Sequence, residues 1–240
     1  MANSYFQFKQ FIIHQDQCVL KVGTDACLLG AFAANYLSKT PNNVNSILDI
    51  GSGSGLLMLM LAQKFNAQID GIEIDKSSYE QAEQNIKNSP WKERLNLFNA
   101  DANAFSFPHK YDFIITNPPF FEGDLKSFSS KKNIAKHDAG LTLYQLLTIV
   151  EASLLPEGNL AILLPTHRAN NFLYHAGEKK LYPSYRLEIK QTPRHKAFRS
   201  IIVLSRIQTV AVQEELVIKE TEMAYSPGFV SLLKDYYLYL

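Results

Sequence analysis

Short apolar runs alternate with longer segments of helical periodicity from Ser46 onward. The segments with helical periodicity follow Ser54, span 76–87 and span 141–155. Seven runs have the composition of strands, namely 46–50, 67–74, 95–100, 111–116, 159–165, 186–192 and 200–207. Strands that alternate with helices are typical of a parallel sheet wrapped by helices. The pattern therefore predicts an α/β fold with a doubly wound, mostly parallel, seven-stranded sheet of the Rossmann-like kind.

Two segments flank this predicted core. The N-terminal extension (1–40) has a helix that begins near Thr24 and Asp25, either of which can cap it. The C-terminal tail (211–240) carries apolar residues at helical spacing, which predicts a helix that packs on the core (41–210): Phe229, Leu232, Leu233, Tyr236 and Leu240. With 240 residues and 46% hydrophobic composition, the chain can bury one full core. We expect a single domain and a monomer.

Charge and cysteine content exclude several classes of protein. The 24 Lys and Arg residues nearly balance the 23 Asp and Glu residues, so any site for a polyanion must be local. Cys18, Cys27 and the six histidines lack metal-ligand spacing, and no metal is expected. The start of the chain has no signal-peptide pattern, and the densest apolar run, 56–62, is far shorter than the ~20 residues of a membrane span. We expect a cytoplasmic protein.

A glycine-rich turn, DIGSGSG at 49–55, follows the first predicted core strand and opens a helix. In that context glycines allow a cofactor to approach the backbone, and the helix start presents free N–H groups. A dinucleotide fingerprint needs a third glycine at position 56, where this chain has Leu56, and the lysine of a phosphate-binding loop is absent. The turn therefore predicts a different cofactor, held by Asp49, Gly51, Gly53 and Gly55.

Further cofactor contacts are expected where the next strands end. Glu73 stands at the end of the second core strand, where doubly wound folds place a carboxylate against ribose hydroxyls, and Asp75 is the nearby alternative. Ile74 lies beside it. After the third strand, Asp101 and Ala102 reach the same edge of the sheet, where an aspartate can bind an adenine amino group.

The tetrapeptide Asn117, Pro118, Pro119 and Phe120 follows the fourth core strand and carries the chemistry. The Asn117 side-chain oxygen and the Pro118 carbonyl are two acceptors, which suit the two hydrogens of one NH₂ group. Phe120 can stack on a flat ring. Accepting both hydrogens turns the nitrogen lone pair toward a methyl sulfonium, so Asn117 also adjoins the cofactor. The two motifs together predict methyl transfer from S-adenosylmethionine to a planar amino group.

With these motifs, the chain resembles the class I methyltransferases. Within them it is similar to the bacterial N6-adenine methyltransferases that act on valine tRNA at position 37. The resemblance extends to 6–32, to NIKNSPWKERLNL, to Tyr225 and to the final YYLYL, and KVGTDA (21–26) is its most discriminating part. It implies S-adenosylmethionine as cofactor, a tRNA adenine as substrate, and Lys21, Gly23 and Thr24 lying over the cofactor.

Two basic segments are candidates for RNA contact. One follows the tetrapeptide and holds Lys126, Lys131, Lys132 and Lys136 without an acid. The other runs from Lys179 to Arg199 with seven basic residues (179, 180, 186, 190, 194, 196 and 199) and one acid, and its expected RNA contacts are Arg194, His195, Lys196 and Arg199. Near the N-terminus, Phe6, Phe8 and Phe11 either stack on bases or pack in the core. A base inside a folded anticodon loop must turn outward to reach Asn117, with Phe120 as the receiving face.

Two alternatives remain at this stage. The same acceptor pair serves guanine N2 in ribosomal RNA or a glutamine amide in a protein, because both are planar NH₂ groups. A cofactor-binding module without activity, which holds RNA or a partner, belongs to a different class. KVGTDA and the basic segments favour adenine in tRNA.

Overall fold

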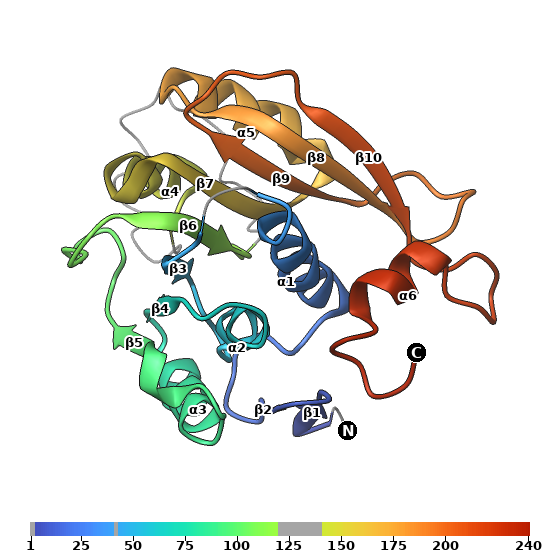
Figure 1. Cartoon of the computed structure of the whole chain (residues 1–240), viewed down its shortest axis with the longest axis horizontal. Coiled ribbons are helices and arrows are strands. Elements are labelled where there is room, and N and C mark those ends of the chain that lie inside the picture. Colours follow the sequence, from blue (N-terminus) through green and yellow to red (C-terminus); the bar gives the residue numbers. More distant parts are fainter. Residues whose placement is uncertain (1–2, 41–42, 120–140) are drawn as a thin grey trace, which may run out of the picture.

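The computed structural model of the protein describes residues 3–40, 43–119 and 141–240. Its centre is a sheet of eight strands in the order β10-β8-β9-β7-β6-β3-β4-β5 (Figure 1). All neighbouring strands are parallel except β9, which is antiparallel to β7 and to β8. The strands are β3 (Ser46–Ile50), β4 (Gln68–Glu73), β5 (Leu95–Asn99), β6 (Tyr111–Thr116), β7 (Leu154–Pro165), β8 (Tyr182–Lys190), β9 (Arg199–Ser205) and β10 (Val212–Val217).

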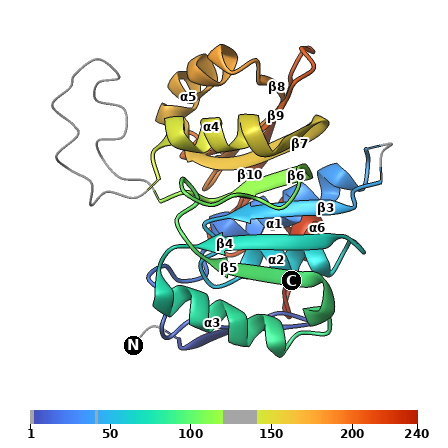
Figure 2. The ribbon, with the colours of Figure 1, turned by 90° about the vertical axis from the view of Figure 1, so that its left-hand side faces the viewer.

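Helices cover both faces of this sheet. The first face carries α1 (Thr24–Leu37), α2 (Leu56–Ala62), α3 (Lys76–Lys87) and α6 (Pro227–Leu233), and the second carries α4 (Leu143–Ser153) and α5 (Thr166–Glu178) (Figure 2). All seven residues of α2 are buried, because the helix lies between the sheet and α1. A short hairpin, β1 (Tyr5–Gln7) and β2 (Ile12–His14), forms a separate two-stranded sheet. A 3-10 turn, η1 (Lys92–Arg94), precedes β5. The predicted doubly wound fold is confirmed.

The predicted number of strands is wrong by one. β10 lies at the edge of the central sheet, paired with β8, although the sequence places this segment in the C-terminal tail. Four of its six residues are exposed, two of them Glu214 and Glu215, so the segment lacks the apolar run that marks a buried strand. Helix α5 was also not predicted, because it buries only four residues, one of them Arg168. Both elements are recognisable only from what they pack against.

The N-terminal aromatic residues belong to the core. Phe8 and Phe11 are buried and stack on each other with ring centroids 4.5 Å apart, and Phe6 packs against the same cluster. Tyr237, from the C-terminal tail, meets the rings of Phe6 and Phe8. Of the two roles considered for these residues, core packing is therefore the correct one.

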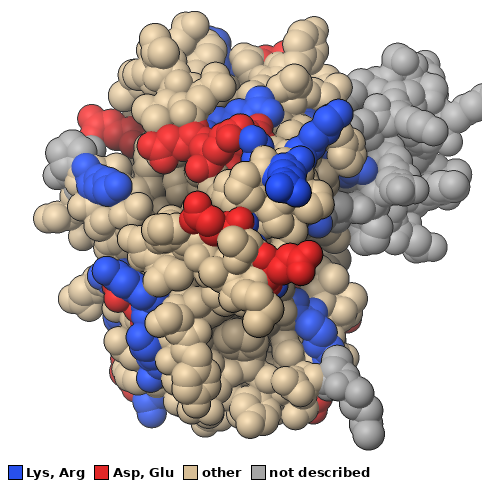
Figure 3. All heavy atoms as spheres, turned by 90° about the vertical axis from the view of Figure 1, so that its right-hand side faces the viewer, with Lys and Arg blue, Asp and Glu red and all other residues tan. Residues whose placement is uncertain are grey.

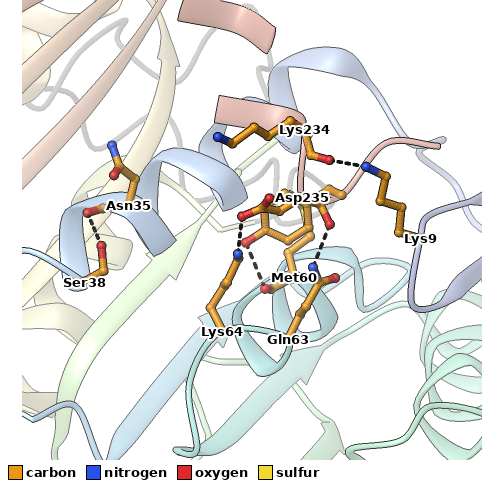
Figure 4. A network of polar contacts seen from close by, with 9 residues as sticks. Lys9, Asn35, Ser38, Met60, Gln63, Lys64, Lys234 and Asp235 are labelled. Carbon is orange, nitrogen blue, oxygen red and sulfur yellow. Dashed lines mark hydrogen bonds and ion pairs between the residues drawn. The ribbon is translucent and has the colours of Figure 1, made fainter. Parts of the chain in front are cut away.

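A polar network joins the two ends of the chain to α2 (Figure 4). The Lys9 ammonium donates to the Lys234 carbonyl over 2.6 Å, and the Gln63 amide donates to the Asp235 carbonyl over 2.8 Å. Lys64 forms an ion pair with the Asp235 carboxylate, which holds the pKa of that carboxyl below its usual value. The network fixes the tail on the first face of the sheet.

The predicted C-terminal helix is confirmed, although it ends at Leu233. Phe229, Leu233 and Tyr236 are buried against the domain, whereas Leu240 is exposed. No helix among the described residues is long and apolar enough to cross a membrane.

Close packing at Gly71 sets the position of the glycine-rich turn on β4. A Cβ atom there would lie 2.4 Å from Met58 Sδ, 2.5 Å from Ser52 Oγ and 2.8 Å from Leu97 Cδ1. Gly71→Ala should therefore destabilise the protein by about 1–3 kcal/mol, the usual cost of overpacking. Gly177→Ala in α5 is the matched control, because nothing lies within 4 Å of its added Cβ, and it should be neutral or stabilising. Chemical denaturation of both variants gives the comparison, and equal stabilities would contradict the expectation.

Candidate active site

The predicted site residues meet at the carboxyl ends of three neighbouring strands. Asp49 lies near the end of β3, Glu73 ends β4, and Asn117 directly follows β6. Asp49 and Glu73 belong to the face of the sheet that α1 and α2 cover, because they alternate with residues of the other face. This is the edge where ligands bind in doubly wound folds.

The glycine-rich turn has the backbone that glycine permits. Gly51, Gly53 and Gly55 have φ of 75°, 53° and 79°, a region in which other residues are strained. Nothing lies within 4 Å of a Cβ built on Gly51 or on Gly53, so the space above both is open. The amides of Gly51 and Ser52 donate to the Ile72 carbonyl, which ties the turn to β4.

The Glu73 carboxylate accepts hydrogen bonds that hold this turn in place. Its Oε2 accepts from the Gly53 amide and its Oε1 from the Asp75 amide, both over 2.8 Å. Asp75 itself caps α3 by accepting from the Ser78 amide. Of the two carboxylates considered, Glu73 is therefore the one next to the turn, and Asp75 has a structural task at the helix start.

Two buried polar groups at this edge lack a partner among the described residues. Neither carboxyl oxygen of Asp49 has a hydrogen bond, and neither has the side-chain oxygen of Asn117. Burial, and then the charge of Glu73, raises the pKa of the Asp49 carboxyl to about 8. Buried acceptors are costly without donors. Together with the open space over Gly51 and Gly53, they fit a ligand that brings cationic or N–H groups, as S-adenosylmethionine does.

The segment before α1 runs along α3 toward the same place. Asn85 of α3 connects this segment to the glycine-rich turn, because its side-chain amide donates to the carbonyls of His14 and Ser54. Burial raises the pKa of the Cys18 thiol to about 11, Lys21 opposes this shift, and Glu73 contributes to it. The segment that carries Lys21 therefore lies close to the carboxyl end of β4.

KVGTDA is the start of α1, but its capping differs from the prediction. Neither Thr24 nor Asp25 caps the helix, because the N-cap residue is Gly23 and no side chain caps it. Thr24 and Cys27 share hydrogen bonds with the Tyr237 hydroxyl of the C-terminal tail. Lys21 donates to the Gln15 carbonyl. The motif is thus held by contacts that lie far away in the sequence.

The remaining predicted cofactor contacts lie along the edge at β4 and β5. Ile74 is 65% exposed, beside Glu73. Asp101 is exposed, and its side chain accepts from the backbone and side-chain amides of Asn103. These two hydrogen bonds form a local turn. Ala102 packs against the second hydrophobic cluster. Both hydrogen bonds of that turn use the same carboxyl oxygen of Asp101, Oδ1.

Part of the predicted site lies outside the described residues. Within the tetrapeptide, Pro118 is buried and Pro119 is exposed, whereas Phe120 is not described. The same holds for the first basic segment, which comprises Lys126, Lys131, Lys132 and Lys136.

The second basic segment comprises the end of α5, β8 and the loop between β8 and β9. Lys179, Arg186 and Lys190 form ion pairs with glutamates of the protein, and the expected RNA contacts lie in the loop and at its end. Arg194, His195 and Lys196 are exposed there. Arg199, at the start of β9, pairs with Pro165 at the carboxyl end of β7 and forms an ion pair with Asp25 over 3.1 Å. The loop therefore lies at the same edge as Asn117. Asp25 and Asn85 were not predicted as contributors, because their partners are distant in sequence.

Comparison with known proteins identifies the family. The family model "Methyltransferase small domain" matches residues 27–164, which is more than half of the chain. The tRNA1(Val) (adenine(37)-N6)-methyltransferase of Dyadobacter fermentans is 42% identical and that of Flavobacterium psychrophilum 39%. These alignments cover 98% and 97% of this chain, and 98% and 99% of those proteins. The chain belongs to the tRNA1(Val) (adenine(37)-N6)-methyltransferase family.

Solved structures agree with this fold. A predicted O-methyltransferase from Agrobacterium tumefaciens superposes with a TM-score of 0.66 at 17% identity, over 88% of this chain and 96% of that one. The ribosomal protein L11 methylase of Lactobacillus delbrueckii subsp. bulgaricus superposes with a TM-score of 0.58 at 14% identity, over 82% and 84%. The predicted family, enzyme class and methyltransferase fold are confirmed. The names of the two relatives favour adenine over guanine N2 or glutamine.

Proposed function

We propose that the protein transfers a methyl group from S-adenosylmethionine to the N6 amino group of adenine 37 in tRNA1(Val). The observation that carries the proposal is the buried oxygen of Asn117, which has no hydrogen-bond partner among residues 3–40, 43–119 and 141–240 and lies at the edge that also holds the glycine-rich turn. The choice of base and of tRNA rests on the two relatives, both of which are named tRNA1(Val) (adenine(37)-N6)-methyltransferase. We expect the enzyme to act in the cytoplasm, where its substrate is found.

Each end of the cofactor has a suitable group in the site. Gly51 and Gly53 leave room for it, Asp49 offers a carboxyl to its ammonium, and Glu73 lies where ribose hydroxyls are bound. Lys21, Gly23 and Thr24 cover it, and Ile74, Asp101 and Ala102 lie along the adenine end. When bound, S-adenosylmethionine supplies an electrophilic methyl group on a sulfonium.

Asn117 and Pro118 orient the acceptor. The side-chain oxygen of Asn117 and the carbonyl of Pro118 each accept one hydrogen of the N6 amino group. The nitrogen lone pair then leaves conjugation with the ring and points at the methyl group, which prepares an in-line displacement. Bound S-adenosylmethionine would supply the methyl group to that nitrogen, and the proton released from N6 would pass to water. No histidine base is required.

The proposal is tested by incubating the purified protein with labelled S-adenosylmethionine and unmodified tRNA1(Val), followed by nucleoside analysis. N6-methyladenosine should appear, and a transcript with guanine in place of adenine 37 should remain unlabelled. A labelled guanine, or a label in a glutamine peptide but not in RNA, would contradict the assignment.

The β8–β9 loop is proposed to hold phosphates of the tRNA through Arg194 and Lys196. Charge reversal of both residues should weaken tRNA binding and lower the slope of log Kd against log salt by about 1.5, because each phosphate contact contributes about 0.7–0.9. Reversal of Lys92 and Lys110, which are exposed before β5 and β6 at the opposite edge, is the matched control. Filter binding at several salt concentrations measures the slope, and equal slopes for both variants would remove the loop from the interface.

A further inference from the structure

The β8–β9 loop presents a single aromatic ring beside its cations. Phe198 is 36% exposed, and Arg194, His195 and Lys196 precede it within four residues. The loop has an ordered turn, since His195 donates its backbone N–H to the Thr192 carbonyl over 3.1 Å and its Nδ1 contacts Thr192 Oγ1 over 2.7 Å. Single exposed aromatic residues are common on protein surfaces, and what distinguishes this one is the group of basic residues that directly precedes it.

The backbone of Phe198 is held from three sides. Its N–H donates to the Ile189 carbonyl over 2.9 Å, and its carbonyl accepts from the Thr166 N–H over 3.3 Å. The Arg199 guanidinium donates to the same carbonyl over 3.3 Å. These bonds join Phe198 to β8, to α5 and to β9, so the ring projects from a fixed backbone.

Arg199 backs this ring. Its Cζ lies over the phenyl ring, 5.5 Å from the centroid, while its Nε is fixed by Asp25 at the start of α1. The guanidinium is thus shared between a carboxylate, a carbonyl and a ring face, all of them in the protein. This changes the expected role of Arg199 from a phosphate contact to a residue that positions Phe198.

The ring lies at a suitable distance from the reacting atoms. Thr116, which precedes Asn117, pairs with Ile162 of β7, and Arg199 pairs with Pro165 on the other side of that strand. Two strand spacings across and three residues along place Phe198 on the order of 15 Å from Asn117. That separation suits a base other than the one that receives the methyl group.

We infer that Phe198 stacks on an unpaired base of the RNA substrate that lies a few nucleotides from the target adenine, with Arg199 as the positioning residue. The inference rests on the proposed function. Aromatic rings beside cations are the usual means of holding single-stranded RNA, because every base has a flat face and every linkage has a phosphate. Figure 3 shows basic and acidic side chains interspersed over one face of the molecule, so such recognition has to be local.

The test compares Phe198→Ala with Phe198→Trp. Phe198→Ala should raise the KM and the Kd for tRNA about tenfold, with kcat and the Kd for S-adenosylmethionine little changed. Phe198→Trp should restore tRNA binding, and its fluorescence should be quenched when tRNA is added, beyond any change from the native Trp91. Tyr239→Ala, at an 89% exposed aromatic residue of the C-terminal tail, is the matched control.

Arg199 is tested in the same assay. Arg199→Ala should raise the KM for tRNA and abolish the quenching in a Phe198→Trp background, whereas Arg199→Lys should recover part of both. Wild-type methylation of tRNA together with unchanged tRNA affinity in folded Phe198→Ala would overturn the inference and leave the proposed function intact. A wild-type protein that binds tRNA but does not methylate it would instead overturn the proposed function.

Discussion

Asn117→Ala should lower kcat by at least about 100-fold while the affinity for S-adenosylmethionine stays within about threefold. The variant removes one of the two acceptors that orient the N6 amino group, so the lone pair is no longer directed at the methyl group. Among the described residues this oxygen is buried without a hydrogen-bond partner, so its removal breaks no hydrogen bond between them. Stability should change little.

Single-turnover kinetics with tRNA1(Val) measure the methyl-transfer rate of this variant, and calorimetry measures the binding of S-adenosylmethionine. Asn66→Ala is the control, since Asn66 is exposed at the far edge of the sheet after α2. A rate for Asn117→Ala within a factor of about ten of the wild type would rule out orientation by Asn117 as the main source of rate.

Asp49 should make the stability of the cofactor-free protein fall as the pH rises toward 8. The folded protein keeps the Asp49 proton up to a pH of about 8, whereas the unfolded chain releases it near pH ~4. Between these values the folded state binds more protons, so the free energy of unfolding falls by about 1.4 kcal/mol per pH unit from this group. Asp49→Asn cannot ionise, and its stability should depend less on pH. Denaturation of both proteins at pH 5.5, 7 and 8.5 measures the difference.

The same carboxyl should couple S-adenosylmethionine binding to proton release. The cationic ligand favours the ionised carboxylate, so affinity should rise with pH up to about 8, and calorimetry in buffers of different ionisation enthalpy should detect the released proton. Asp49→Asn should bind about tenfold more weakly without that release. Glu93→Gln, an exposed carboxyl near the opposite edge, should behave like the wild type. Equal proton release from the wild type and Asp49→Asn would show that another group titrates.

Much of the fold was predictable because its signals are local. The strand 46–50 and the helix 76–87 were predicted with the bounds that the structure gives, since each combines an apolar pattern with a clear start. Strand β10 was not, because four of its six residues are exposed, and helix α5 was not, because only four of its residues are buried and just one of these, Phe172, is large and apolar. β10 is placed by its pairing with β8, and α5 is placed by packing against α4, β8 and β9 as well as against the adjacent β7.

The candidate chemistry of the site is readable from the sequence alone: glycines at 51, 53 and 55, which form a left-handed turn, a carboxylate at 73, and the proposed acceptors at 117 and 118. These motifs work through the backbone and side chains of adjacent residues, so their spacing is enough to recognise them. The environment of Asp49, the helix cap at Asp75 and the contacts of Arg199 with Asp25 and Phe198 became visible in the folded protein alone. The burial of a carboxyl, the charges near it and the exposure of an aromatic ring all depend on which distant segments meet in the fold. A local sequence pattern does not show which segments these are.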